Sequence, residues 1–356
     1  MTDVAPQHTA AIAAGAKCLD CPLYNKHLGP VPPTLPPEGS RIPFLVVAEA
    51  PGPAEVDEGE TLIGPSGREV RNALANAGVD PQQVSYTNAI LCKPPETNLE
   101  EYLRECKKKG LRSPLECCKP RLEAELYRAD YAVFVGGAAI RAAGIGKSIM
   151  HLRGTPLLAR PGLATLHPAF VLRDQGKVMR PIFWQDIAKA VRLANGGNTW
   201  RDPPYTVVYD PNTLAAMCSR MSLDVSVDTE TDGKDRWTCN VRRVGLDDGT
   251  TNIIYAPLSV NGHWLLPEHV RLQCWQVLAR FFSESRNWVF HNYFGFDSIV
   301  LERHGCPVNE KNLFDTLIGH RVGVTSEFPH GLDFLGSTFT DAPYWKDVAS
   351  HEKFDD

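Results

Sequence analysis

Short apolar runs alternate with longer amphipathic segments along the first half of the chain. The apolar runs cover residues 45–48, 84–92, 131–135 and 163–166. Each run is rich in β-branched or aromatic residues and ends at a polar residue or at proline and glycine, as buried strands do. Amphipathic segments at 68–77 and 185–193 predict helices between and after them, and the basic stretch before residue 163 predicts a hairpin-like segment. Strands that alternate with helices indicate an α/β domain.

The second half has its own sequence of elements. Strand-like runs cover 205–209, 225–231, 243–246, 251–255 and 288–292, with a helical pattern at 271–282. Between the halves, Gly196 and Gly197 stand between two asparagines, a composition typical of a linker. The pattern therefore predicts two domains of different fold, at residues 1–197 and 203–356.

Composition restricts the classes of protein to consider. The 356 residues are 43% hydrophobic and 22% charged, enough apolar material for a core in each domain. The net charge of −5 predicts that any nucleic-acid contact comes from local basic patches. No stretch is apolar enough for a membrane span and residues 1–16 lack a signal layout, so we expect no membrane partner and a cytoplasmic location. In such a chain, the ten cysteines favour metal or cluster ligation over disulfides.

Three polar residues stand at predicted strand ends in the first half: Glu49, Asn88 and His167. Open α/β sheets hold their ligands at the carboxyl ends of the strands, so the fold would bring the three together. An amide can read the edge of a nucleobase, and an imidazole can stabilise a departing anion. Taken singly, the asparagine and the histidine are more often turn formers, so the prediction depends on their combination.

Five motifs occur in order along the first half of the chain. They are Cys18-Leu-Asp-Cys21-Pro-Leu23, Ala48–Gly52, Thr87–Pro95, Cys118–Leu122 and His167–Arg173. Together they resemble the iron–sulfur uracil-DNA glycosylases of family 4, over residues 1 to about 195. The resemblance implies a three-layer α/β/α uracil-DNA glycosylase fold that acts on DNA, single- or double-stranded.

The resemblance also implies a [4Fe–4S] cluster of mainly structural role. The implied ligands are Cys18, Cys21, Cys92 and Cys118. Cys106 is a competing fourth ligand, because its separation from Cys92 is closer to the family's spacing, and Cys117 is a further alternative. Cys118 is preferred because Pro120 and Leu122 follow it as in the family motif.

For the pocket, the resemblance implies that Glu49, Asn88 and His167 line the uracil site. Asn88 would read the base, and His167 would stabilise the uracil anion. The implied base or DNA contacts are Ala50, Pro51, Glu55, Leu62, Leu172 and Arg173. Leu172 and Arg173 would lie at the wedge that supports base flipping. Leu62 stands where the family has a stacking phenylalanine, which puts the range of bases in doubt.

A pair of carboxylates marks the second half. Asp228 and Glu230 are one residue apart on a predicted strand, so both point to the same face and can bridge divalent cations. Asp297 follows at a helix start. With Phe314–Leu317 and His330–Asp333, they resemble the 3′–5′ proofreading exonuclease domain of family A DNA polymerases, over residues of about 205 to 350. This implies a ribonuclease H-like α/β fold and Mg²⁺ or Mn²⁺ as cofactor.

The family's fourth acid lies in a Tyr-x-x-x-Asp motif, and the pair Tyr344–Asp347 has the wrong spacing for it. We therefore expect an incomplete exonuclease domain, with a DNA polymerase following in the same gene. The combined hypothesis is a microbial or phage DNA repair and replication enzyme that excises uracil and carries a proofreading-type exonuclease domain. The alternative is a replication-associated DNA-binding or nuclease protein whose glycosylase-like half is a non-catalytic, cluster-bearing scaffold.

Overall fold

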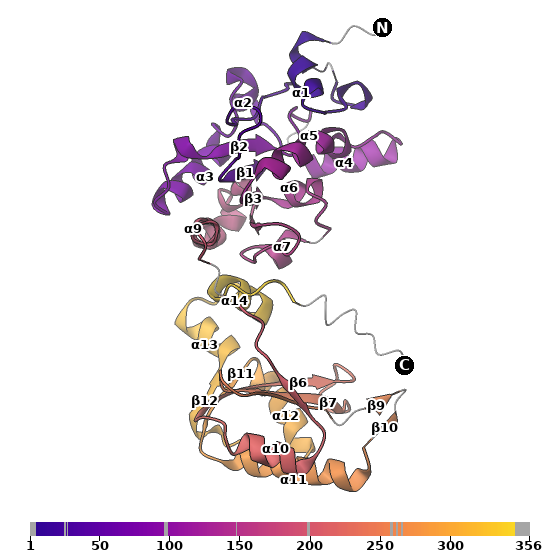
Figure 1. Cartoon of the computed structure of the whole chain (residues 1–356), viewed down its shortest axis with the longest axis vertical. Helices are drawn as coiled ribbons and strands as arrows, with labels where there is room; N and C mark the ends of the chain where they lie inside the picture. The colour runs from indigo at the N-terminus through magenta and orange to yellow at the C-terminus, as the bar shows by residue number, and fades with distance from the viewer. Residues whose placement is uncertain are drawn as a thin grey trace. The chain divides into compact units, whose positions relative to one another are not determined.

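The computed structural model describes residues 5–24, 26, 28–95, 99–146, 148–197, 200–256, 259–260, 263–264 and 266–345. The chain forms two compact units (Figure 1). The first comprises Met1–Trp200 and Asp333–Tyr344, and the second comprises Arg201–Leu332 and Trp345–Asp356. The contacts thus place Asp333–Tyr344 with the first unit, whereas the sequence predicted 203–356 as one domain. None of the helices that the described residues form is both long enough and apolar enough to cross a membrane.

The first unit is built on a four-stranded parallel sheet in the order β2-β1-β3-β4. Its strands are β1 (Leu45–Ala48), β2 (Ser85–Asn88), β3 (Ala132–Val135) and β4 (Gly162–Thr165). Every strand residue is buried, which explains why these segments read as continuous apolar runs and not as alternating ones. The predicted α/β class is confirmed.

Helices cover the sheet of the first unit. They are α1 (Thr9–Ala13), α2 (Pro53–Glu58), α3 (Pro65–Asn76), α4 (Leu99–Lys108), α5 (Pro114–Arg128), α6 (Gly137–Ala142), α7 (Ile149–Leu152), α8 (Pro168–Val171), α9 (Arg180–Ala194) and α14 (Leu332–Phe339), with short 3₁₀ helices η1 (Pro6–His8), η2 (Cys18–Asp20), η3 (Pro81–Gln83) and η4 (Asp174–Met179). Figure 1 shows α3 and α9 on one side of the sheet and α5 and α6 on the other.

The hairpin-like segment predicted before residue 163 is confirmed only in its last part, where Pro156 and Leu163 form an antiparallel bridge and Leu157 N donates to Gly162 O at 2.9 Å. Two helices, α6 and α7, occupy the stretch before it. Alanines favour the first of these helices, and the Ser148 side chain caps the second by accepting from Met150 N. The predicted strand 84–92 is also shorter than expected. It leaves the sheet after Asn88, although Ala89 to Leu91 stay buried.

The second unit contains a six-stranded mixed sheet in the order β12-β11-β6-β7-β8-β5. Its strands are β5 (Thr206–Val208), β6 (Asp224–Thr231), β7 (Val241–Asp247), β8 (Asn252–Tyr255), β11 (Asn287–Phe290) and β12 (Leu313–Asp315), and β9 (Ser259–Val260) and β10 (His263–Trp264) form a separate ribbon. The helices are α10 (Pro211–Cys218), α11 (Glu268–Ser283), α12 (Asp297–Arg303) and α13 (Thr316–Gly323), with η5 (Tyr293–Gly295) and η6 (Glu310–Asn312). In Figure 1, α10 and α11 lie together beside this sheet.

The core of the second unit is centred on aromatic residues. Trp288 on β11 is fully buried, and its ring meets those of Phe281 and Phe282 edge-on, with centroids 5.2 and 5.3 Å away. Such edge-to-face contacts add to the free energy gained from burial. Because β11 pairs directly with β6, this packing fixes the strand on which Asp228 and Glu230 stand.

Candidate functional site

The carboxyl edge of the first sheet brings together residues from four strands. Glu49 directly follows β1, Asn88 ends β2, Gly136 directly follows β3, and His167 follows β4 by two residues. Because all four strands are parallel, these residues meet at one edge of the sheet. The structure therefore places the predicted trio on one edge, and it adds Gly136.

Glu49 and His167 face each other across Gly136. One Glu49 oxygen, Oε1, accepts from Ala138 N at 3.0 Å, and the other, Oε2, lies 3.9 Å from His167 Nε2. Gly136 has φ +100°, and a Cβ built on it would lie 2.4 Å from Glu49 Oε1 and 2.9 Å from His167 Cδ2. Only glycine leaves both side chains where they are.

The hydrogen bonds of His167 assign its tautomer. Its Nδ1 accepts from Ala169 N at 3.1 Å, at the start of α8. A neutral imidazole carries one N–H, so the proton sits on Nε2, toward Glu49. Burial lowers the pKa of His167, Glu49 acts in the opposite direction, and Arg173 lowers it further. The ring is thus a neutral donor at pH 7.

Asn88 is buried with an unused donor. Its side chain is 1% exposed, and among the described residues its Nδ2 has no hydrogen-bond partner. Its backbone oxygen accepts from Arg121 Nη2 at 2.7 Å, while Arg121 Nη1 reaches Thr87 Oγ1 at 2.9 Å and Glu125 at 2.7 Å. A buried amide without a partner costs free energy unless a ligand meets it. Arg121 on α5 supports this strand end, a role that was not predicted from the sequence.

Five cysteines surround one cavity near the N-terminus. They are Cys18, Cys21, Cys92, Cys117 and Cys118. Cys106 does not line this cavity; it is buried on α4, where Tyr102 is a hydrogen-bonding neighbour. The structure thus places Cys117 and Cys118, but not Cys106, beside the other three.

The chemistry of this cavity fits an iron–sulfur cluster. Burial raises the pKa of the Cys18 thiol to about 11 and that of Cys92 to about 12, so their thiolates need a positive partner such as iron. Within the described part of the chain, no group of three or more His, Cys, Asp or Glu side chains is arranged to hold a single metal ion. A cluster holds its thiolates further apart than one ion does, so both observations are compatible with it.

The acids of the second unit influence one another electrostatically. Asp228 and Glu230 point to the exposed face of β6, and Thr229 between them points inward, where its Oγ1 donates to Asp297 Oδ1 at 2.5 Å. Desolvation of its carboxylate raises the pKa of Asp228 to about 6, and the negative charge of Glu230 raises it further. Burial raises the pKa of Asp297 to about 7; Asp228 adds to the rise and the bond from Thr229 opposes it. Asp228, Glu230 and Asp297 offer the carboxylate oxygens that divalent cations prefer, although among the described residues no three such side chains are arranged around one ion.

Two family models match the chain. Residues 34–191 match the uracil DNA glycosylase superfamily, and residues 205–350 match a 3′–5′ exonuclease family. The chain joins a uracil DNA glycosylase superfamily domain to a 3′–5′ exonuclease domain. Both predicted resemblances and the fold class are thereby confirmed.

Individual relatives agree with the assignment of the glycosylase domain. A type-4 uracil-DNA glycosylase of Thermotoga maritima is 29% identical over 182 residues, which are 49% of this chain and 88% of the relative. A type-4 enzyme of Pyrobaculum aerophilum is 30% identical over 106 residues, 30% of this chain and about half (47%) of that relative. Among solved structures, the catalytic core of RRP6 from Trypanosoma brucei is 21% identical, with a TM-score of 0.31 and coverage of 38% of this chain and 34% of that one.

The loop after β1 in the glycosylase domain is held by Glu55. Its two oxygens accept from Gly52 N at 2.8 Å and Gly64 N at 3.1 Å, so this carboxylate supports backbone on both sides. Leu62 in the same loop is 4% exposed and has φ +59°, a conformation uncommon outside glycine. Pro51 is buried and Ala50 partly so. Contact of these residues with base or DNA stays a prediction.

A small apolar surface follows the carboxyl edge of the sheet in the glycosylase domain. Leu172 is 37% exposed and Arg173 is also exposed, directly after α8. Phe170 on α8 is 39% exposed, a neighbour that the sequence analysis did not assign to DNA. Solvent-exposed apolar side chains are what a wedge between bases requires.

Asp315 has a structural role in the exonuclease domain. Its Oδ1 caps α13 by accepting from Leu317 N and Ile318 N, and it also accepts from Asn292 N. Its Oδ2 is buried and has no partner among the described residues. Asp315 also contributes to the raised pKa of Asp297. Tyr344 and Asp347 were considered for the family's Tyr-x-x-x-Asp motif, and Asp347 lies outside the described residues.

Proposed function

We propose that the glycosylase domain excises uracil from DNA by hydrolysing the N-glycosidic bond. The supporting observation is the arrangement at one sheet edge of a buried, unused amide donor on Asn88 and a neutral imidazole donor on His167. These donors suit a flat base with carbonyl oxygens, and the type-4 relatives carry the name of this activity.

Each side chain has a distinct part in this mechanism. Asn88 Nδ2 donates to the edge of the flipped base, since it has no other partner among the described residues. His167 Nε2–H stabilises the negative charge that develops on the base as the bond breaks. Glu49, 3.9 Å from that nitrogen, is the carboxylate available to orient the attacking water. Gly136 provides the space that both require.

The cluster has a supporting part in the proposal. Cys18, Cys21, Cys92 and Cys118 would hold a [4Fe–4S] cluster, with Cys117 beside them in the same cavity. When bound, it supplies a covalent connection between segments distant in sequence. The residues themselves bring η2, the segment after β2 and α5 together.

For the exonuclease domain, we propose hydrolysis of DNA from its 3′ end with Mg²⁺ or Mn²⁺. The raised pKa values of Asp228 and Asp297 support it, because burial and then neighbouring carboxylates disfavour their charged forms, which a divalent cation would stabilise. Glu230 completes the set that would hold the cation. The proposal includes a DNA polymerase encoded in the same gene. It also includes a microbial or phage source.

Uracil release from labelled single- and double-stranded oligonucleotides tests the first activity. The full chain should be used, because Asp333–Tyr344 packs with the glycosylase unit. We expect Asn88→Ala and His167→Ala each to lower excision at least about tenfold while DNA binding is nearly kept, since a preorganised donor contributes about 2–4 kcal/mol in the transition state.

Asn76→Ala is the matched control, because Asn76 ends α3 with its side chain in solvent. Full activity of both pocket variants would remove these residues from the chemistry. DNA binding by the wild-type chain with no uracil release would favour the non-catalytic scaffold instead.

A further inference from the structure

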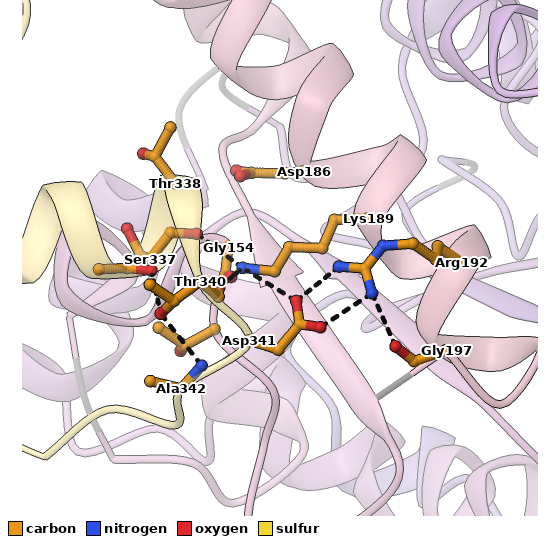
Figure 2. Close-up of polar contacts among 12 residues, drawn as sticks. Gly154, Asp186, Lys189, Arg192, Gly197, Ser337, Thr338, Thr340, Asp341 and Ala342 are labelled. Atoms are coloured by element: carbon orange, nitrogen blue, oxygen red, sulfur yellow. Dashed lines mark hydrogen bonds and ion pairs between the residues drawn. The ribbon is translucent and has the colours of Figure 1, made fainter. Parts of the chain in front are cut away.

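Residues 333–344 lie within the match to the exonuclease family but belong to the first compact unit, where they pack against α9 through their backbone (Figure 2). Lys189 Nζ donates to Ser337 O at 2.8 Å and to Thr340 O, and Gln185 Nε2 donates to Thr338 O at 3.0 Å. The last carbonyls of a helix have no donors within it. Side chains of α9 therefore cap the C-terminal end of α14.

A buried ion pair adds to the contacts that hold this segment. Arg153 is fully buried and binds Asp186 through Nε at 3.0 Å and Nη2 at 2.6 Å. Its remaining nitrogen, Nη1, donates to Ser337 Oγ at 3.0 Å and Thr338 Oγ1 at 3.2 Å, and its guanidinium lies over the ring of Phe334. A buried charge is tolerated when its hydrogen bonds are complete. Two hydroxyls of the segment complete those of Arg153.

Two further anchors hold the part of the segment that follows Ser337 and Thr338. Asp341 forms a two-pronged ion pair with Arg192, at 2.8 and 2.5 Å, and Figure 2 shows it between Arg192 and Lys189. Beyond it, Tyr344 is buried in the apolar core of the first unit and its ring stacks on His151 at 5.7 Å. Backbone, charge and apolar contacts thus all fix the segment in one register.

The same group of contacts extends to the strand that leads to His167. Asp186 Oδ2 accepts from Thr165 Oγ1 at 2.8 Å, and Thr165 ends β4 two residues before His167. Gly154 lies between Asp186 and Ser337. A Cβ there would come within 2.6 Å of Asp186 Oδ1 and 2.7 Å of Ser337 O. The segment, α9 and the end of β4 are therefore in continuous contact.

We propose that residues 333–344 are an intramolecular docking segment that holds the Thr165–His167 end of β4 in its working position. Asp186 and Arg153 act as positioning residues, since neither lies at the reacting atoms. Docking itself is independent of the chemistry of the pocket, and its effect on catalysis rests on the proposed uracil excision.

Charge reversal at Asp341 tests docking in the full chain. Asp341→Lys would face Lys189 and Arg192, whereas Asp341→Glu keeps the charge. We expect Asp341→Lys to raise amide hydrogen exchange in 333–344 and in β4 at least about fivefold, and Asp341→Glu to leave it near wild type. The control is Asp130→Lys, an exposed aspartate paired with Arg41, which should change neither segment.

Uracil excision by the same variants tests positioning. Asp341→Lys should lower kcat about tenfold with little change in KM, because misplaced catalytic groups slow the chemical step more than they weaken binding, and Asp341→Glu should restore kcat. Unchanged exchange in Asp341→Lys would overturn docking. Raised exchange with unchanged kcat would overturn positioning. Absence of excision by the wild type would refute the proposed function, while the exchange data would still decide docking.

Discussion

Replacing Gly136 by alanine is the most direct test of the catalytic edge. Gly136 has φ +100° and ψ 168°, a region that is nearly restricted to glycine. A Cβ there would lie 2.4 Å from Glu49 Oε1, 2.8 Å from Glu49 Cδ and 2.9 Å from His167 Cδ2. All three contacts fall on the two side chains that the mechanism needs, and none falls on backbone.

The structure separates the effect on stability from the effect on activity. The backbone conformation should cost about 1–3 kcal/mol of unfolding free energy. The clashing atoms are the end of a flexible carboxylate and the edge of a ring, so they can move aside and add little to this cost. Once moved, His167 no longer donates where charge develops, which should lower excision about 100-fold or more.

The assay combines urea unfolding with uracil excision under conditions where both variants stay folded. Gly144→Ala is the matched control, because Gly144 also has a positive φ (+78°) but a Cβ added there would meet no atom within 4 Å. We expect similar losses of stability in the two variants and a large loss of activity only in Gly136→Ala. Equal activity in the two would refute the arrangement of Glu49 and His167 described above.

Four other tests address the cysteines, the cation site, the stability of the exonuclease domain and the loop after β1. Cys92→Ser should remove the broad visible absorption of an iron–sulfur protein and Cys106→Ser should keep it; stoichiometric zinc after anaerobic purification would contradict the cluster. Calorimetry should show Mn²⁺ binding weaken from about pH 8 to about pH 6, because Asp297, with its pKa near 7, must first lose a proton. Asp297→Asn should remove the part of that dependence near pH 7 and leave the part near pH 6 that comes from Asp228. Without metal, the raised pKa should make the exonuclease domain less stable as pH rises from about 4 through about 7, measurable by urea unfolding. Leu62→Phe should speed excision if this residue faces the base, since stacking contributes about 1–3 kcal/mol; unchanged kinetics with lower stability would place Leu62 in the core.

The strand-end residues could be predicted because their positions follow from local pattern. Glu49, Asn88 and His167 each stand where an apolar run stops, and parallel strands bring such positions to one edge. Gly136 was visible only as the residue that ends a strand. Its importance depends on the space that its missing Cβ would fill, which involves side chains 87 residues before and 31 residues after it in the chain.

The position of residues 333–344 could not be predicted in the same way. His330–Asp333 resembles an exonuclease motif, so the sequence assigned the region to the second domain. The donors that hold it, Lys189 and Arg192, are about 150 residues away and read locally as the polar face of a helix. Capping of one helix by another is a tertiary contact that leaves no local pattern.

Arg121 makes one helix serve two parts of the glycosylase domain. It lies one turn after Cys118 on α5, and its guanidinium holds the backbone oxygens of Asn88 and Ala89. A shift of α5 at its cysteine end would therefore be transmitted to the strand end that carries Asn88. Under the proposed function, loss of iron from the cysteine cavity would reach Asn88 through α5, so uracil excision would depend on the iron content of the protein.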